Sequence, residues 1–291
     1  MPDSEGLSGR DTSRISVAPD AKKEAEIFDK FDFGSAQVES PRHPQQDYCA
    51  TAFPLVGDDY LVALVADGIG SLKHAADASL MAGELFVDDV RRAAEKDELR
   101  KEFDLERITR NLNVYLLSAS QKRVRELRRE AEGTGQEAVD FDDEIFEFET
   151  QFSTTFTAIV ILGGKVMSTH LGDSRLYLHS RGFLNRMSSD QTVAEERRSC
   201  GETDIKPQDE STLMNYLGNR EAAFEVDEHA AVSDDIWLLV SDGVYNVLSD
   251  GELEEILNQP RSAQSMANGI IDAVKKKGVI DDASAVVVKV K

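Results

Sequence analysis

The feature that most constrains this chain is a set of apolar runs that each end at an acidic residue. The run LVALVADGIGS reaches Asp67, STHLGDSRLYL contains Asp173, and WLLVSDGVY contains Asp242. In GVIDDASAVVVKV, Asp281 and Asp282 stand directly before such a run. One Asp-Gly ending is ordinary turn chemistry. Its recurrence indicates a common cause, because strand ends converge when neighbouring strands finish at one edge of a sheet or sandwich.

Alternating and helical apolar patterns outline the remaining elements. Strands are expected at 27–38, 48–54 and 60–66, within 154–188, and at 235–241 and 284–291, and helices at 76–95, 105–132, 250–259 and 262–278. Gly163-Gly164 and Arg181-Gly182 are expected to form hairpin turns. The strands come in clusters with helices between them, which favours an α+β fold with antiparallel strands over strict βαβ alternation.

The chain is expected to form a single domain over residues 26–291. Residues 1–25 are polar and are interpreted as a disordered N-terminal arm. The acidic stretch 133–151 begins with glycine and is interpreted as a connecting loop, and the polar segment 189–212 as a surface flap with a short helix. The sequence shows no internal repeat and no clear linker that would indicate a second domain.

Composition restricts the classes of partner. The formal net charge of −22 argues against nucleic acid, since phosphate binding needs a basic face. The longest apolar runs fall well short of the ~20 residues of a membrane span, and the polar first residues predict no secretion signal. Cys49 and Cys200 stand far apart and are interpreted as free thiols in a reducing compartment. We therefore expect a cytoplasmic protein with no membrane partner.

The convergent acids predict a metal site. Several carboxylates in one small space repel one another and are tolerated only when a cation neutralises them. Oxygen ligands without His or Cys favour hard cations such as Mg²⁺, Mn²⁺ or Ca²⁺. Gly68 lets the backbone approach closely, so its carbonyl is a further candidate ligand. Two such ions ~3.5–4 Å apart would activate a water for attack on phosphorus.

These motifs resemble one family. ADGIG, TTFTAIVILGGKVMSTHLGDSRLYL, LLVSDGVYNVLSDGE and DDAS occur in the order found in the metal-dependent Ser/Thr protein phosphatases of type 2C (the PPM family), particularly the bacterial forms. SPRHPQQDYC adds the family's arginine five residues before an aspartate, here Arg42 and Asp47. The resemblance covers about residues 31–290. It implies a β-sandwich of two antiparallel sheets with helix pairs on both outer faces (αββα), and a flap near the active site.

The resemblance also implies roles for single residues. The implied metal ligands are Asp47, Asp67, Gly68, Asp173, Asp242 and Asp281. Asp67 would bridge two Mn²⁺ or Mg²⁺ ions, Asp47 would act through a metal-bound water, and Asp173 would support a third, weaker ion. Arg42 would bind the substrate phosphate with two parallel hydrogen bonds. The implied catalytic residues are Arg42, Asp47, Asp67 and Asp242.

Four positions depart from the family pattern. Gln46 replaces the acid that usually precedes the aspartate of the first motif, and Ser71 replaces the second glycine of the DG-x-GG run. Asp282 replaces an asparagine, which leaves open whether Asp281 or Asp282 binds metal. Ile69 stands where animal members carry a histidine proposed as general acid, and bacterial members commonly have an apolar residue there. None of these changes removes a core ligand.

Two other hydrolase classes share part of the pattern. GDS also opens one class of serine esterases, but that class places the motif near the N-terminus and needs a later Asp-x-x-His pair. Neither His179 nor His229 stands in such a pair. An aspartyl-phosphate phosphatase needs a second acid two residues after its nucleophile, and Ile69 stands at that distance from Asp67. Both classes are therefore disfavoured.

We therefore expect a monomeric phosphoprotein phosphatase that hydrolyses phosphoserine or phosphothreonine and opposes a Ser/Thr kinase in bacterial signalling. The alternative is a regulatory or binding module that keeps the phosphatase fold with weakened chemistry, which Gln46, Ser71 and Asp282 favour. Metal titration separates the two, because a degenerate module would show weak metal binding or metal binding without turnover.

Overall fold

Two antiparallel sheets form the centre of the protein. The computed structural model describes residues 29–52, 60–70, 72, 74–95, 103–134 and 152–291. Sheet A has the strand order β1 (Phe31–Val38), β10 (Ala283–Val290), β9 (Ile236–Val240), β6 (Arg175–Ser180) and β7 (Phe183–Arg186). Sheet B has the order β2 (Asp47–Ala52), β3 (Tyr60–Asp67), β4 (Phe156–Leu162), β5 (Lys165–Leu171) and β8 (Val226–Ala230). Every neighbouring pair is antiparallel.

The inner strands are continuously apolar because both of their faces are buried. Successive side chains of a strand point to opposite faces of the sheet. In β3, Leu61, Ala63 and Val65 belong to the core between the two sheets. Val62 and Leu64 belong instead to the core between sheet B and its helices. Burial on both faces removes the apolar–polar alternation of a half-exposed strand, which is why this segment forms one unbroken aliphatic run.

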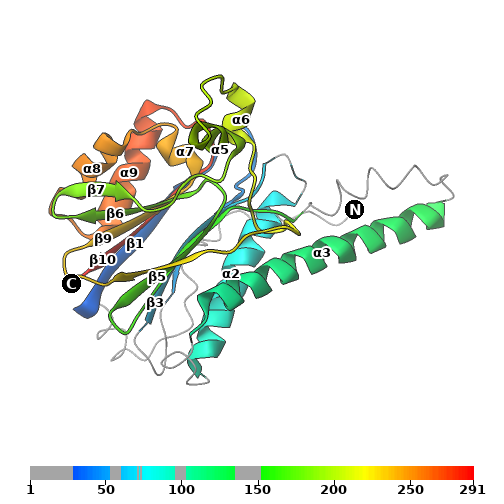
Figure 1. The fold of residues 1–291 in the computed structure, drawn as a ribbon, viewed down its shortest axis with the longest axis horizontal. Coiled ribbons are helices and arrows are strands. Elements are labelled where there is room, and N and C mark those ends of the chain that lie inside the picture. Colours follow the sequence, from blue (N-terminus) through cyan, green and yellow to red (C-terminus); the bar gives the residue numbers. More distant parts are fainter. Residues whose placement is uncertain (1–28, 53–59, 71, 73, 96–102, 135–151) are drawn as a thin grey trace, which may run out of the picture.

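Helix pairs cover the outer face of each sheet (Figure 1). α2 (Ala75–Glu95) and α3 (Leu105–Thr134) lie on sheet B, and α8 (Asp250–Leu257) and α9 (Ala263–Lys277) lie on sheet A. Phe86 of α2 meets Phe156 of β4 with ring centroids 5.0 Å apart. The predicted α+β sandwich with helices on both faces is therefore confirmed.

The flap segment 189–212 contains two short helices, where the sequence predicts one. They are α5 (Val193–Ser199) and α6 (Pro207–Ser211). Arg197 of α5 donates a hydrogen bond of 2.7 Å to Asp209 of α6. At the base of the flap, the Gly172 N–H donates to the Gln191 side chain at 2.9 Å, and the Gln191 N–H donates to the Gly172 carbonyl at 2.8 Å. The flap therefore starts directly from an acid-bearing turn.

Some boundaries differ from the sequence-based prediction. β1 begins at Phe31, later than the expected residue 27, and α3 continues to Thr134, two residues past its expected end. β8 and the short helix α7 (Asp242–Tyr245) are absent from the prediction. The predicted arm 1–25, the end of the second strand at 53–54, Ser71 and the loop 135–151 lie outside the described residues. Within the described ranges, no helix is both long enough and apolar enough to span a bilayer.

Candidate active site

Asp47 and Asp67 lie opposite each other where β2 begins and β3 ends. They are cross-strand partners, so the register that pairs the two strands also brings the two carboxylates together. Like charges in this arrangement are destabilising. The charges of Asp173, Asp242 and Asp281 also act on Asp67. The structure therefore gathers the five predicted acids at one edge of the sandwich.

Burial and mutual repulsion favour the protonated form of these acids. Burial raises the pKa of Asp67 well above its usual range, and the charges of Asp47 and Asp242 raise it further. Burial also raises the pKa of Asp242, and the charges of Asp173 and Asp281 add to the effect. The pKa values of Asp47 and Asp173 are each raised to about 6, with burial as the largest cause. A divalent cation would relieve the same repulsion that protons relieve here.

Asp47 is buried and has one carboxylate oxygen without a protein partner. Its Oδ2 accepts hydrogen bonds from the Ser241 hydroxyl at 2.7 Å and from the Ser284 hydroxyl at 2.6 Å. Its Oδ1 is buried and has no hydrogen-bond partner among the described residues. Such an oxygen costs free energy unless something binds it. The oxygen-rich donor set around it fits Mg²⁺ or Mn²⁺, or a water that such an ion holds.

Gly68 occupies a point where the turn after β3 passes the start of α2. A Cβ atom built on Gly68 would lie 2.3 Å from the carbonyl oxygen of Ala75, so no larger residue fits without movement of the backbone. The Gly68 N–H donates to the carbonyl of Gln46 at 3.1 Å, which joins this turn to the start of β2. The packing explains why glycine stands here. The role of its carbonyl as a metal ligand stays a prediction.

Hydrogen bonds to the Asp282 carboxylate hold the loop between β1 and β2, which carries Arg42. Its buried carboxylate accepts hydrogen bonds from the backbone N–H groups of Ser40 and Gln46, each at 2.6 Å. The Arg42 N–H donates to the Ser40 hydroxyl at 3.2 Å, and the Arg42 side chain is exposed. Asp281 is half-exposed at the cluster. Because both oxygens of Asp282 already hold the loop, the arrangement favours Asp281 over Asp282 as the metal ligand.

Comparison with known proteins identifies the family of this chain. The model of the family described as protein phosphatase 2C matches residues 37–277. The chain belongs to the protein phosphatase 2C family. It is 33% identical over 141 residues to the serine/threonine protein phosphatase PstP of Mycobacterium tuberculosis, a match that covers 47% of this chain and 27% of PstP. This phosphatase-family chain therefore matches only about a quarter of the length of that relative.

Longer matches exist at lower identity. The serine/threonine phosphatase stp of Listeria monocytogenes is 26% identical over 240 residues, which cover 80% of this chain and 85% of stp. The solved catalytic domain of PstP, in complex with two manganese ions, is similar with a TM-score of 0.66 at 21% identity, over 90% of this chain and 98% of that chain. The predicted family and the predicted fold are therefore confirmed, whereas the individual ligand assignments stay predictions.

Several residues that sequence analysis did not single out complete the site of this phosphatase 2C member. Ser241 and Ser284, which hold Asp47, stand inside the quoted VSDG and DDAS motifs, so the motifs could have indicated them. Burial raises the pKa of Asp173, and a hydrogen bond from Tyr245 offsets part of that rise. The centroid of the Tyr245 ring lies 3.6 Å from the Arg175 guanidinium carbon. The sequence carries no signal for Tyr245 beyond its place shortly after the SDG motif.

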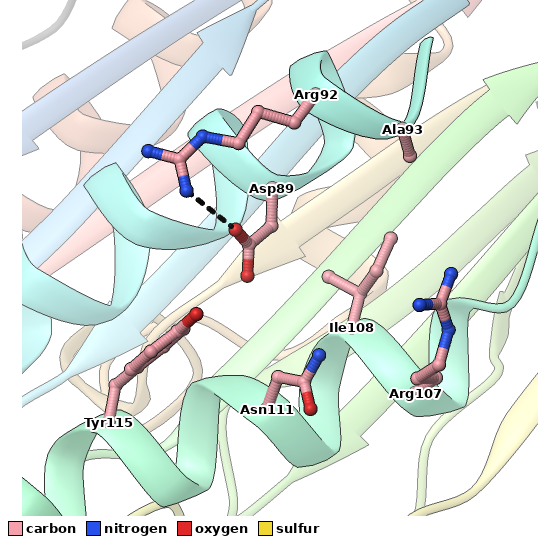
Figure 2. Close-up of a pocket in the computed structure, with 7 residues that line it drawn as sticks. All are labelled: Asp89, Arg92, Ala93, Arg107, Ile108, Asn111 and Tyr115. Carbon is pink, nitrogen blue, oxygen red and sulfur yellow. Dashed lines mark ion pairs between the residues drawn. The ribbon is translucent and has the colours of Figure 1, made fainter. Parts of the chain in front are cut away.

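A separate cavity lies between α2 and α3 (Figure 2). It has a volume of about 190 Å³ and is lined by Asp89, Arg92, Ala93, Arg107, Ile108, Asn111 and Tyr115. Asp89 and Arg92 form an ion pair of 3.6 Å at its edge. The cavity lies toward the C-terminal end of α2, about 20 Å along the helix from Ala75 by the rise of an α-helix. It is therefore not part of the acid cluster.

Proposed function

We propose that this chain is an active Ser/Thr protein phosphatase that hydrolyses phosphoserine and phosphothreonine with two divalent ions, Mn²⁺ or Mg²⁺. The observation that carries the proposal is the buried Asp47, whose Oδ1 has no hydrogen-bond partner in the part of the chain that the structure describes, within a cluster of acids. Asp67, Asp242 and Asp281 would hold the ions together with Asp47, and Asp173 would hold a third. When bound, the ions lower the pKa of water to supply a nucleophile and offset charge on the phosphoryl group.

The side chains of the protein would orient the substrate and the acids. Arg42 stands exposed on a loop that Asp282 holds in place, so its guanidinium can bind two phosphate oxygens at once. Ser241 and Ser284 hold the Asp47 carboxylate in one orientation. Ile69 has no proton to donate, so the leaving alkoxide would take its proton from solvent or from another group.

The deciding experiment is phosphate release from a phosphothreonine peptide by the purified protein with Mn²⁺, repeated with EDTA. Release that disappears on chelation supports the proposal. Folded, manganese-bound protein without release would favour the alternative, a binding module on a phosphatase fold. Gln46 still favours that alternative, because it removes a carboxylate from the site. Asp282 favours it less, because the residue has a structural role in holding the loop.

We also propose that the protein acts as a cytoplasmic monomer that opposes a Ser/Thr kinase, with the flap 189–212 selecting the phosphoprotein. The named relatives that support this are bacterial phosphatases, and the net charge of −22 disfavours nucleic acid as a partner. Quantitative comparison of phosphopeptides in cells with and without the protein tests the substrate class. Limited proteolysis tests the predicted single domain 26–291, and light scattering tests the monomer.

A further inference from the structure

A histidine lies against the acid cluster and has no role in the mechanism above. His43 stands on the loop between β1 and β2, next to Arg42, and its side chain is 29% exposed. Its Nε2 lies 3.0 Å from Oδ1 of Asp281. Its Nδ1 lies 3.0 Å from the carbonyl oxygen of Pro44 and 3.6 Å from Oδ2 of Asp282. One ligand atom from each of His43, Asp281 and Asp282 lies within 4.8 Å of the others.

The hydrogen-bond partners of the ring determine where its proton sits. The Pro44 carbonyl oxygen can only accept a hydrogen bond, so Nδ1 carries a proton and donates it. In the neutral imidazole, Nε2 then presents a lone pair to Oδ1 of Asp281, which is also an acceptor when ionised. In the metal-free protein a second ring proton, donated from Nε2 to Asp281, satisfies this contact, and the two side chains then form an ion pair at 3.0 Å.

A divalent ion that displaces this proton could bind both atoms with suitable geometry. Adjacent ligand atoms of an octahedral ion with bonds of about 2.1 Å are about 3 Å apart, which matches the separation of His43 Nε2 and Asp281 Oδ1. Metal-bound histidines commonly donate their second ring N–H to a backbone carbonyl or a carboxylate. The Pro44 carbonyl provides this partner, and Asp282 holds the ends of the loop by accepting from Ser40 and Gln46.

We propose that His43 Nε2 is a nitrogen ligand to the divalent ion that Asp281 holds, an inference that rests on the metal centre of the proposed function. Imidazole favours later transition metals, whereas oxygen ligands alone suit Mg²⁺. His43 therefore gives this site a preference for ions such as Co²⁺ over Mg²⁺. The residue is a specificity-determining ligand of the metal, and it leaves the phosphate contact to Arg42.

The test measures the affinities of Co²⁺ and Mg²⁺ by calorimetry in the full chain and in His43→Gln. The variant should bind Co²⁺ ~10- to 100-fold more weakly, with a change of less than about threefold for Mg²⁺. His74→Gln is the matched control, because His74 also pairs with one carboxylate, Asp77, at 3.0 Å, and its ring stacks on Phe152. Affinities for both ions that stay the same, or fall by the same factor, in His43→Gln would overturn the inference.

A second measurement does not depend on affinity. Pulsed electron paramagnetic resonance of bound Mn²⁺ should show hyperfine coupling to a histidine nitrogen in the unmodified protein and in His74→Gln, and no such coupling in His43→Gln. Absence of the coupling from the unmodified protein would exclude nitrogen ligation. Failure of the proposed function would look different: the nitrogen signal and the Co²⁺ preference would be present, but no phosphate would be released from the phosphothreonine peptide.

Discussion

The base of the flap and the acid cluster differ in whether cationic side chains neutralise their carboxylates. Asp190, whose side chain is 13% exposed, accepts two hydrogen bonds from Arg175, at 2.7 and 3.1 Å, and pairs with Arg186 at 2.5 Å. Asp47 and Asp67 lie among other acids and hydroxyl groups, and no ion pair to Lys or Arg is formed by them within the described part of the chain. The chain neutralises the first acid itself, whereas neutralisation of Asp47 and Asp67 would come from the cations of the proposed metal centre.

The sharpest test of this comparison is Asp242→Asn, which should affect activity and stability in opposite directions. Loss of a predicted ligand should lower kcat/KM ~10³-fold or more, because the proposed metal centre would provide most of the transition-state stabilisation. Loss of one repelling charge should raise the Tm of the metal-free protein by a few degrees, on the order of 1 kcal/mol. Phosphate release with Mn²⁺ and thermal unfolding in EDTA measure the two effects. Near-normal activity of the folded, metal-loaded variant would show that Asp242 is not a ligand needed for catalysis.

Asp190→Asn tests the base of the flap, where cationic side chains neutralise the acid, and should mainly lower stability. Removal of one partner leaves Arg175 and Arg186 poorly paired, so the free energy of unfolding should fall by ~2–4 kcal/mol in urea denaturation. The control is Asp234→Asn, because Asp234 is 84% exposed and pairs with Lys289 at 3.5 Å. That change should cost less than about 0.5 kcal/mol. Equal losses of unfolding free energy in both variants would show that the ion pairs of Asp190 with Arg175 and Arg186 stabilise the protein no more than an exposed pair does.

The stability of the metal-free protein should depend on pH, because burying ionised carboxylates in the acid cluster costs free energy. The pKa of Asp47 is raised from 3.8 to about 6 in the folded protein, so folding favours its protonated form. Its contribution to stability is complete below pH ~4 and is lost as the pH rises through ~6, a change of roughly 2–3 kcal/mol. Asp173 acts in the same direction. Urea denaturation from pH 4.5 to 7.5 should show the loss in EDTA and a smaller loss with Mn²⁺, and a flat profile in EDTA would contradict it.

Arg42→Ala should have the smallest effect, because this arginine is exposed and is predicted to contact only the substrate. KM for a phosphopeptide should rise ~10-fold with little change in kcat, since the contact exists in both the ground state and the transition state. Arg42→Lys should lie between, because lysine cannot form the two parallel hydrogen bonds. Arg110→Ala, which removes a surface pair with Glu106 on α3, is the control. An unchanged KM in Arg42→Ala would show that Arg42 does not bind the substrate phosphate.

Much of the fold could be predicted because its local signals are strong. β3 ends at Asp67, as the aliphatic run predicts, and the hairpin glycines Gly163 and Gly164 adopt positive φ angles between β4 and β5. β8 was missed because it is an edge strand that exposes Asp227 and Glu228, and such charges hide the strand pattern. α7 was missed because four residues are too few for a helical period.

By itself, the sequence determined the order of the main strands and helices, the acids at the strand ends and the family. Only the tertiary structure decided which groups each acid contacts. Ser241 and Ser284 reach Asp47 across 194 and 237 residues of sequence, and Asp282 reaches Ser40 across 242. These contacts depend on how distant strands align, and no local pattern records that alignment. Adjacent residues entering a strand also point in different directions. This is why Asp282 turns inward to hold the loop while Asp281 stays at the cluster beside His43.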